Sequence, residues 1–411
     1  MQSEGTVSIL GDVVLNKRSN SPGPGERTTT VTFVQGYLPE YRIPFFQGLR
    51  EELVTKGIDL QVGYGRPSPT MAARNDERHL AWAMQLKYRH LEFAGRSITW
   101  RSIWPKAGEA DLLVLEDAIG KLDTWWYIVS RRLMRRPVAL WGHAETQTVN
   151  AFERRLRNLL RGWADWYFAY TEDGKFNLGL TEFPPPRITS VGNSIDLRPL
   201  QQATKSVTLD QIEEDRSALG LERGHTALFL GSLDGSKGLD LLVTACDTVS
   251  ARDPLFKLVI IGDGPKRKFL EDMALNRPWI IIRGPVHDPY DKARAAASAD
   301  VLLSIVVGLV AVDSFALETP IITTDCGRHG PEFGYLEHEV NALVANENQE
   351  SFAAEIMRAL SDTKLREGLA LHCRSDASKY GSEKMITRFS RGITDALEAG
   401  VRRDDLIRHE T

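Results

Sequence analysis

The sequence predicts an α/β protein with two doubly wound domains, and three observations carry this prediction. Short runs rich in β-branched residues alternate with longer amphipathic segments, which is typical of βαβ units around a parallel sheet. The same alternation restarts about halfway along the chain. Residues 193–215, between the two blocks, are polar and turn-rich and are expected to be a linker. The 411 residues also suit two domains of about 100–200 residues each.

Each β-branched run is expected to be one strand. The first block contains Thr30–Gln35, Asp59–Tyr64, Asp111–Glu116, Pro137–Trp141, Trp166–Tyr170 and Arg187–Gly192. The second block contains Thr226–Gly231, Phe256–Gly262, Trp279–Gly284, Asp300–Ile305 and Pro320–Thr324. The predicted domains are therefore residues 29–198 and 199–378, with a helix in 379–411 that crosses back to the first domain. Residues 1–28, rich in Ser, Pro and Gly near their end, predict a mobile leader.

Composition narrows the functional class. Hydrophobic residues make up 42% and charged residues 26%, and the net charge of -4 does not favour nucleic acid. Cys246, Cys326 and Cys373 lie far apart without metal-like spacing and suit a reducing compartment. The N-terminus lacks the apolar run of a signal peptide, and the longest apolar stretch, Val301–Val312, is shorter than the about 20 residues that span a bilayer. A cytoplasmic location is expected.

The ends of the strands deserve most attention, because ligands of doubly wound sheets bind beyond the carboxyl ends of the strands. In Leu228–Leu242 a strand ends at Gly231, a glycine-containing loop follows, and Lys237 precedes a helix. Backbone N–H groups, a helix N-terminus and one ammonium group can hold a diphosphate. A plain strand-to-helix turn with a solvated lysine is the alternative.

Two further strand ends carry motifs. Gly262 and Gly264 begin a dinucleotide fingerprint, but Arg267 replaces its third glycine, so these glycines support either close backbone approach or a tight turn. In Ser304–Thr324, Gly308 lets a ligand approach the backbone, and Asp313 near a helix start could accept hydrogen bonds from a ribose diol. Compensation of the helix dipole is the other role open to Asp313.

In this order and spacing the motifs resemble the GT4 family of retaining glycosyltransferases over nearly the whole chain. The resemblance rests on seven segments: Gly231-Ser232 through Lys237-Gly238, Gly262–Pro265, Gly308 to Asp313, Thr319–Ile322, Pro331-Glu332 with Tyr335 and Asn341, Tyr41–Leu49, and Gly192–Leu197. It implies the GT-B fold, two Rossmann-like domains that face each other across a cleft. The acceptor would bind the first domain and a nucleotide-sugar the second.

The resemblance also implies site residues. The catalytic candidates are His143, Lys237 and Asp313. The donor-binding candidates are Gly231, Ser232, Gly262, Gly264, Gly308, Leu309, Val310 and Glu332. No D-x-D signature follows a strand, so no metal and no other cofactor are expected. The acceptor would be a glycan, a lipid-linked or a small molecule, in cell-envelope or exopolysaccharide synthesis.

Three positions depart from the family pattern. Ile305 stands at the first acidic position of the E-x7-E pair, Ser232 at the phosphate-loop arginine, and Glu318 at a glycine. These departures keep open a catalytically silent GT-B partner subunit. A second alternative is an NAD-dependent oxidoreductase, which rests on Gly262 and Gly264 alone.

His143 follows a predicted parallel strand, where an imidazole could donate to a sugar hydroxyl or steady developing charge. A helix cap or the partner of a buried carbonyl is its alternative role.

Two helices are both basic and aromatic, Leu122–Arg136 and Ala151–Trp166. In the second, one face carries Phe152, Leu156, Leu159 and Trp163, and Arg154, Arg155 and Arg161 lie off that face. Such helices predict either peripheral contact with the inner face of an anionic membrane or packing on the sheet with a solvated basic face.

Overall fold

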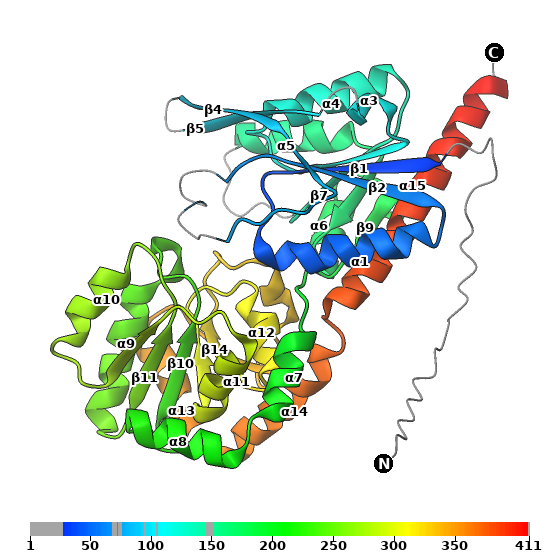
Figure 1. Ribbon diagram of the computed structural model, residues 1–411. Coiled ribbons are helices and arrows are strands. Elements are labelled where there is room, and N and C mark those ends of the chain that lie inside the picture. Colours follow the sequence, from blue (N-terminus) through cyan, green and yellow to red (C-terminus); the bar gives the residue numbers. More distant parts are fainter. Residues whose placement is uncertain are drawn as a thin grey trace, which may run out of the picture.

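The computed structural model describes residues 28–67, 72, 76–93, 96–103, 106–144 and 151–409. It shows two parallel sheets, each covered by helices on both faces, in two domains (Figure 1). The predicted fold class is confirmed. Apart from Thr28, the predicted leader lies outside the described residues.

The N-terminal domain is built on a seven-stranded parallel sheet. Its strands in spatial order are β3 (Met84–Gln85), β2 (Ile58–Tyr64), β1 (Thr29–Gln35), β6 (Leu112–Glu116), β7 (Val138–Gly142), β8 (Trp166–Ala169) and β9 (Ile188–Ser190). An antiparallel hairpin of β4 (Lys87–Phe93) and β5 (Arg96–Ser102) stands beside this sheet. The helical elements are η1 (Glu40–Arg42), α1 (Ile43–Val54), α3 (Lys106–Glu109), α4 (Leu122–Leu133), α5 (Ala151–Gly162), α6 (Glu172–Gly179) and η2 (Pro185–Arg187).

The C-terminal domain repeats this plan with six parallel strands. Their spatial order is β12 (Ile280–Gly284), β11 (Lys257–Ile261), β10 (Thr226–Leu230), β13 (Val301–Leu303), β14 (Ile321–Thr324) and β15 (Ala342–Ala345). The helical elements are α7 (Arg198–Ser206), α8 (Leu209–Leu219), η3 (Gly235–Lys237), α9 (Leu239–Arg252), α10 (Arg267–Ala274), α11 (Pro289–Ser298), α12 (Val310–Ala316), η4 (Pro331–Tyr335), α13 (Gln349–Ser361) and α14 (Thr363–Ala377). Apolar residues of β10, β11 and β13 alternate between two cores, one under α9 and α13 and one under α11 and α12.

Every predicted strand is present, with ends that differ by one or two residues. The polar linker predicted over residues 193–215 is largely wrong, because α7 and most of α8 fall within it. A capping box at Thr208 and Gln211 starts α8, and Gly220, in the left-handed conformation at φ 62°, ends it. The polar composition of this segment reflects helices on the surface of the domain rather than an extended connection.

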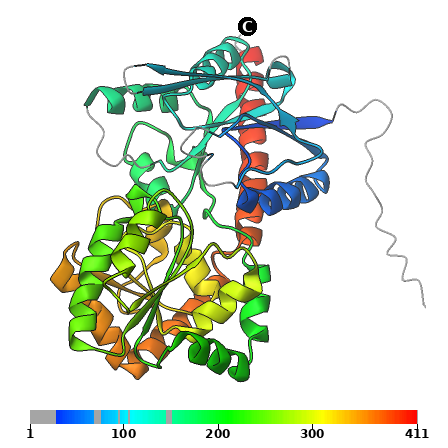
Figure 2. The same cartoon turned by 60° about the vertical axis from the view of Figure 1, so that its left-hand side comes forward.

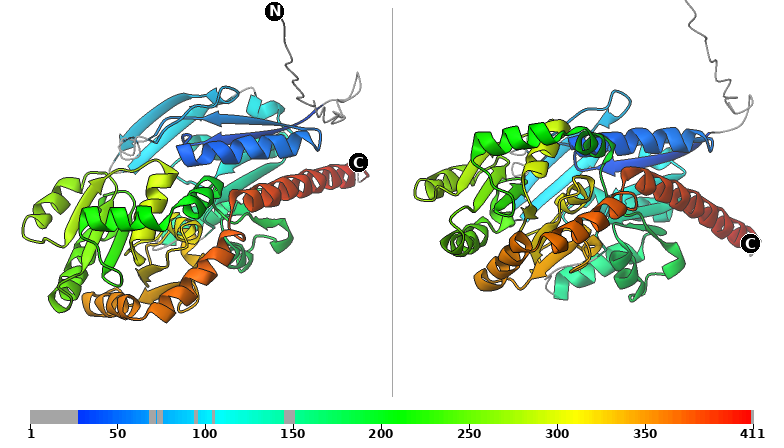
Figure 3. Two further views of the ribbon diagram at one scale, coloured as in Figure 1. Left: turned by 60° about the horizontal axis from the view of Figure 1, so that its bottom comes forward. Right: turned by 90° about the horizontal axis from the view of Figure 1, so that it is seen from below.

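The chain passes between the domains at two adjacent places. Ser382 N–H donates to the Ile195 carbonyl at 3.1 Å, and the Ser194 hydroxyl donates to the Tyr380 carbonyl. From there α15 (Ser382–His409) runs along the N-terminal domain beside α1 (Figures 2 and 3). Phe389 of α15 stacks on Phe168 of β8, with ring centroids 4.7 Å apart. The last helix therefore completes the core of the first domain.

Candidate functional site

The loop after β10 is held by its own polar side chains. The Ser232 hydroxyl donates to one Asp234 carboxylate oxygen at 2.8 Å, and the other accepts from Ser236 N–H at 2.9 Å. Ser232, a donor-binding candidate, thus orders this loop in the structure. Burial opposes ionisation of Asp234, but hydrogen bonds from Ser236 and Ser232 lower its pKa, and the charge of Lys237, half-buried at the end of the loop, adds to this shift. Gly238 then adopts φ 64° directly before α9.

Gly262 and Gly264 are required by a close contact between two loops. A Cβ on Gly262 would lie 1.8 Å from the Gly231 carbonyl oxygen, and one on Gly264 would lie 2.5 Å from the Leu233 carbonyl oxygen. Leu233 N–H donates to the Asp263 carbonyl at 2.9 Å, which locks the two loops together. Gly262 and Gly264 are therefore needed for the close packing of the two loops. This packing explains both glycines without a bound dinucleotide.

The loop after β13 lies against the Lys237 loop. Ile305 is fully buried, and a Cβ on Gly238 would lie 2.7 Å from its Cγ2 atom. The first acidic position of the family motif is thus filled here by an apolar side chain that packs against the loop of Lys237. Gly308 follows with open space where its Cβ would be, so a ligand can approach this backbone.

Gly308 leads into α12, the helix whose N-cap is Leu309 and whose first residue is Val310. Asp313 lies in the first turn of α12. Burial raises the pKa of its carboxyl group to about 6, and Lys292 of α11 counteracts part of that shift. In the described residues no hydrogen bond or ion pair of the Asp313 carboxylate is present, so it remains available to a ligand.

His329 fixes the Gly308 loop and was not predicted from the sequence. Its Nδ1 accepts from Val307 N–H at 3.0 Å, and its Nε2 lies 2.8 Å from the Thr324 carbonyl oxygen, to which it must donate. Its ring stacks on Phe333 at 4.0 Å. Burial lowers the pKa of His329, which favours the neutral imidazole that this pair of bonds requires.

Glu332 is the centre of a polar cluster that joins both domains. It is buried, and it accepts a short hydrogen bond from the Asn193 side chain. The Asn193 amide oxygen in turn accepts from Arg42 at 2.5 Å. Burial raises the pKa of Glu332, whereas the Asn193 bond and the charges of Arg42 and Lys237 oppose this shift. Arg42, Asn193 and Glu332 thus form a hydrogen-bonded chain where the domains touch, and Lys237 lies within electrostatic range of it.

His143 lies at the carboxyl end of β7, next to this cluster. Its side chain is exposed, and its ring lies 4.6 Å from that of Tyr170. Burial of its surroundings lowers the pKa of His143, Asp117 raises it, and Arg42 and Arg157 lower it further. His143 makes no hydrogen bond or ion pair with the part of the chain that the structure describes, so no buried carbonyl is its partner.

The predicted residues therefore fall into groups. Lys237 and Glu332 lie within electrostatic reach of each other, and Arg42 links Glu332 to His143 across the domains. Asp313 belongs to a neighbouring site beside Lys292. Arg42 and Asn193 received no individual role from the sequence, although both stand in segments that carry the family resemblance.

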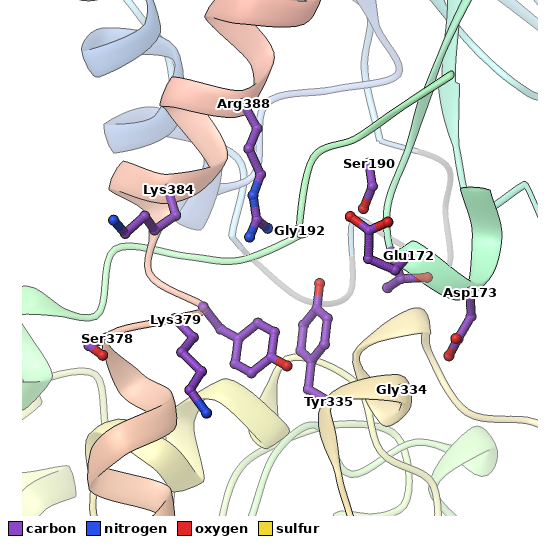
Figure 4. A pocket seen from close by; sticks show the side chains of 12 residues that line it. Glu172, Asp173, Ser190, Gly192, Gly334, Tyr335, Ser378, Lys379, Lys384 and Arg388 are labelled. Atoms are coloured by element: carbon purple, nitrogen blue, oxygen red, sulfur yellow. The ribbon is translucent and has the colours of Figure 1, made fainter. Parts of the chain in front are cut away.

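A pocket of about 760 Å³ opens at the hinge, beside this cluster (Figure 4). Glu172 and Asp173 at the start of α6 form one wall, and Lys384 and Arg388 of α15 form the other. No predicted site residue lines it. The polar cluster, rather than this pocket, is the candidate site, because the predicted phosphate loop and His143 converge there.

Within the described ranges, no group of three or more His, Cys, Asp or Glu side chains could hold a metal ion. None of the helices in those ranges is both long and apolar enough to cross a membrane.

Comparisons with known proteins fit this geometry. Residues 224–362 match the family model described as glycosyl transferases group 1. An uncharacterized glycosyltransferase of Methanocaldococcus jannaschii is 32% identical over 164 residues, which are 37% of this chain and 40% of that protein. A D-inositol 3-phosphate glycosyltransferase of Jonesia denitrificans is 28% identical over 214 residues, 48% of each protein. The matched segments thus span less than half of either relative.

The fold extends beyond these segments. The crystal structure of Anabaena HepE in complex with UDP has a TM-score of 0.65 at 14% sequence identity. The match covers 89% of this chain and 99% of that one, so the two proteins share the two-domain GT-B fold.

Proposed function

We propose that the protein transfers a sugar from a nucleotide-sugar donor to an acceptor, because residues 224–362 match the group 1 glycosyl transferases. The observation that carries the proposal is the cluster of Arg42, Asn193 and Glu332 between the domains, flanked by Lys237 and His143. It brings groups from the donor and acceptor domains to one point. Transfer requires such a junction, because the two substrates react only when they are held together.

The donor diphosphate binds at the loop between β10 and α9. Lys237 and the backbone N–H groups at the start of α9 supply positive charge there. The close packing of this loop against the Gly262–Gly264 loop fixes the conformation of the diphosphate site. The nucleotide ribose binds Asp313, whose carboxylate makes no hydrogen bond to the described residues. Anabaena HepE has been crystallised with UDP and with UDP-glucose, which makes a uridine nucleotide the first candidate.

The reacting sugar lies between the domains, against His143 and Glu332. Burial lowers the pKa of His143 and so favours its neutral imidazole, in which one nitrogen can donate to a sugar hydroxyl while the other accepts. Lys237 stabilises the departing diphosphate. We propose that transfer proceeds with retention, without a metal ion, and in cell-envelope or exopolysaccharide synthesis at the inner face of a membrane. Retention and the pathway rest on the family resemblance, the absence of a metal ion rests on the lack of a D-x-D signature after a strand, and the membrane location rests on the two basic, aromatic helices.

A thermal-shift panel tests the proposal. UDP, GDP, their sugar conjugates and NAD(P) are added singly to the wild-type chain and to Lys237→Ala, because a ligand of the folded state raises the melting temperature. One nucleotide and its sugar conjugate should stabilise the wild type and lose that effect in the variant. Stabilisation by NAD(P) alone would identify an oxidoreductase, and no response to any ligand would favour a silent partner subunit.

A further inference from the structure

Helix α4 carries an outward stripe of large apolar residues. The exposed fractions are 49% for Leu122, 56% for Trp126, 38% for Val129 and 81% for Leu133. Their spacing of four, three and four residues places them on one face of the helix. A contiguous apolar face of this kind costs free energy in water and typically marks an interaction surface.

The opposite face of α4 already anchors the helix. Tyr127 and Ile128 are buried in the core under the sheet. Arg131 is also buried and donates to the Ala107 and Pro137 carbonyls, at 2.9 and 2.6 Å. The buried face therefore anchors α4, and the outward stripe remains partly exposed to solvent.

The stripe continues onto neighbouring elements. Trp100 of β5 is 36% exposed and lies 6.4 Å from the Trp126 ring, centroid to centroid. Met134, directly after α4, is 40% exposed. We call these six residues the α4 surface: Trp100, Leu122, Trp126, Val129, Leu133 and Met134.

Exposed basic side chains border the α4 surface, and the carboxylate of Glu109 on the neighbouring α3 is also exposed. Arg132 and Arg135 are exposed at the end of α4, and Lys87 and Arg89 are exposed on β4 of the adjoining hairpin. Asp123, the acidic residue of α4, is fully buried and paired with Arg101. Tryptophans and leucines with a basic rim match the boundary between the headgroups and acyl chains of an anionic bilayer.

The α4 surface is also open and close to the acceptor side of the site. α4 forms the outer layer of the N-terminal domain, on the side away from the C-terminal domain (Figures 1 and 2). Glu116 at the end of β6 pairs with Trp141 of β7. α4 begins six residues after Glu116, and His143 stands two residues after Trp141. The start of α4 therefore borders the edge of the sheet from which His143 projects.

We infer that the α4 surface docks on an anionic membrane and presents the acceptor domain to a membrane-anchored acceptor. The existence of an acceptor rests on the proposed function, whereas docking of the α4 surface on a membrane does not depend on it. A protein partner or a second copy of this chain would use the same apolar stripe, and the test separates these cases.

Vesicle co-sedimentation of the full chain provides the test. The vesicles contain phosphatidylcholine, with or without about a quarter of phosphatidylglycerol. Leu133→Glu is compared with Leu275→Glu, because both leucines are 81% exposed and Leu275 lies on the C-terminal domain, remote from α4. The wild type and Leu275→Glu should sediment with the anionic vesicles, and Leu133→Glu should lose at least about tenfold in partitioning. Thermal melts establish that both variants are folded.

Several outcomes would overturn the inference. These are equal sedimentation of Leu133→Glu and the wild type, equal binding to vesicles with and without phosphatidylglycerol, and a wild type that stays in solution. A wild-type dimer that becomes monomeric in Leu133→Glu, without vesicle binding, would assign the surface to a second copy. Donor-induced stabilisation of Leu133→Glu is measured in parallel. Its retention shows that a failure of docking leaves the proposed transferase function standing.

Discussion

Replacing Arg42 by methionine removes the charge that compensates the buried Glu332 and keeps much of the volume of the side chain. Arg42 donates to Asn193 at 2.5 Å, and its guanidinium carbon lies 5.0 Å from the centre of the Trp141 ring. Removing one partner from a buried charged network costs about 3–5 kcal/mol. Lys237 still acts on Glu332, so we expect a loss of about 3 kcal/mol in the free energy of unfolding at pH 7.

The pH dependence identifies Glu332 as the cause. Its pKa is already raised in the folded state, so the folded protein binds a proton more readily than the unfolded chain. Stability from this group therefore increases as the pH falls from its folded pKa toward its unfolded value, and without Arg42 the increase should be steeper. The Arg42→Met/Glu332→Gln double variant should lose this slope and recover part of the stability.

Urea denaturation between pH 5 and pH 8 measures both effects. Arg50→Met is the matched control, because Arg50 also lies over a tryptophan ring, at 4.6 Å from the centre of Trp82, without a buried carboxylate beside it. The reasoning is refuted if Arg42→Met is destabilised by less than about 1 kcal/mol, or if its stability follows the same pH profile as the wild type.

Three further variants separate binding from reaction. Lys237→Ala should weaken UDP-sugar binding by about 2–5 kcal/mol in calorimetry. The control Lys268→Ala, which changes an exposed lysine of α10, should leave binding unchanged. Donor affinity of Lys237→Ala within twofold of wild type would show that Lys237 does not bind the diphosphate. Wild-type affinity for a UDP-sugar should fall as the pH drops through about 6, because Asp313 then becomes protonated, and Asp313→Asn should bind weakly at every pH. Equal affinities of Asp313→Asn and the wild type above pH 7 would show that Asp313 only compensates the helix dipole. His143→Ala should bind nucleotide normally while kcat and kcat/KM fall together, and a normal kcat would exclude it from the reaction step.

The sequence predicted the strands well because buried parallel strands are nearly continuous apolar runs. β3, β4, β5 and β15 were not predicted: β3 and β15 are short, and the hairpin of β4 and β5, which alternates residues such as Lys87, Tyr88 and Arg89, has no such run. The segment around α7 and α8 was interpreted as a linker, because polar surface helices and polar loops have similar composition.

The candidate site was predicted in part for a related reason. Strand ends located Lys237 and His143, since the rule that ligands bind there needs no contact information. The cluster of Arg42, Asn193 and Glu332 depends on contacts across 139 and 151 residues of sequence, which no local pattern encodes. Likewise, Ile305 visibly lacks a carboxylate in the sequence, but only the fold shows that its side chain packs against Gly238 in the loop of Lys237.

Turnover of a nucleotide-sugar tests the central claim most directly. The nucleotide-sugar that stabilises the wild type is incubated with the chain and anionic vesicles that carry a lipid extract as acceptor, and release of the nucleoside diphosphate is followed together with incorporation of labelled sugar. The account predicts stoichiometric release and incorporation by the wild type, and binding without turnover by His143→Ala. A wild type that binds the donor, transfers nothing from any nucleotide-sugar and instead binds a protein partner tightly would contradict the account and identify a silent subunit.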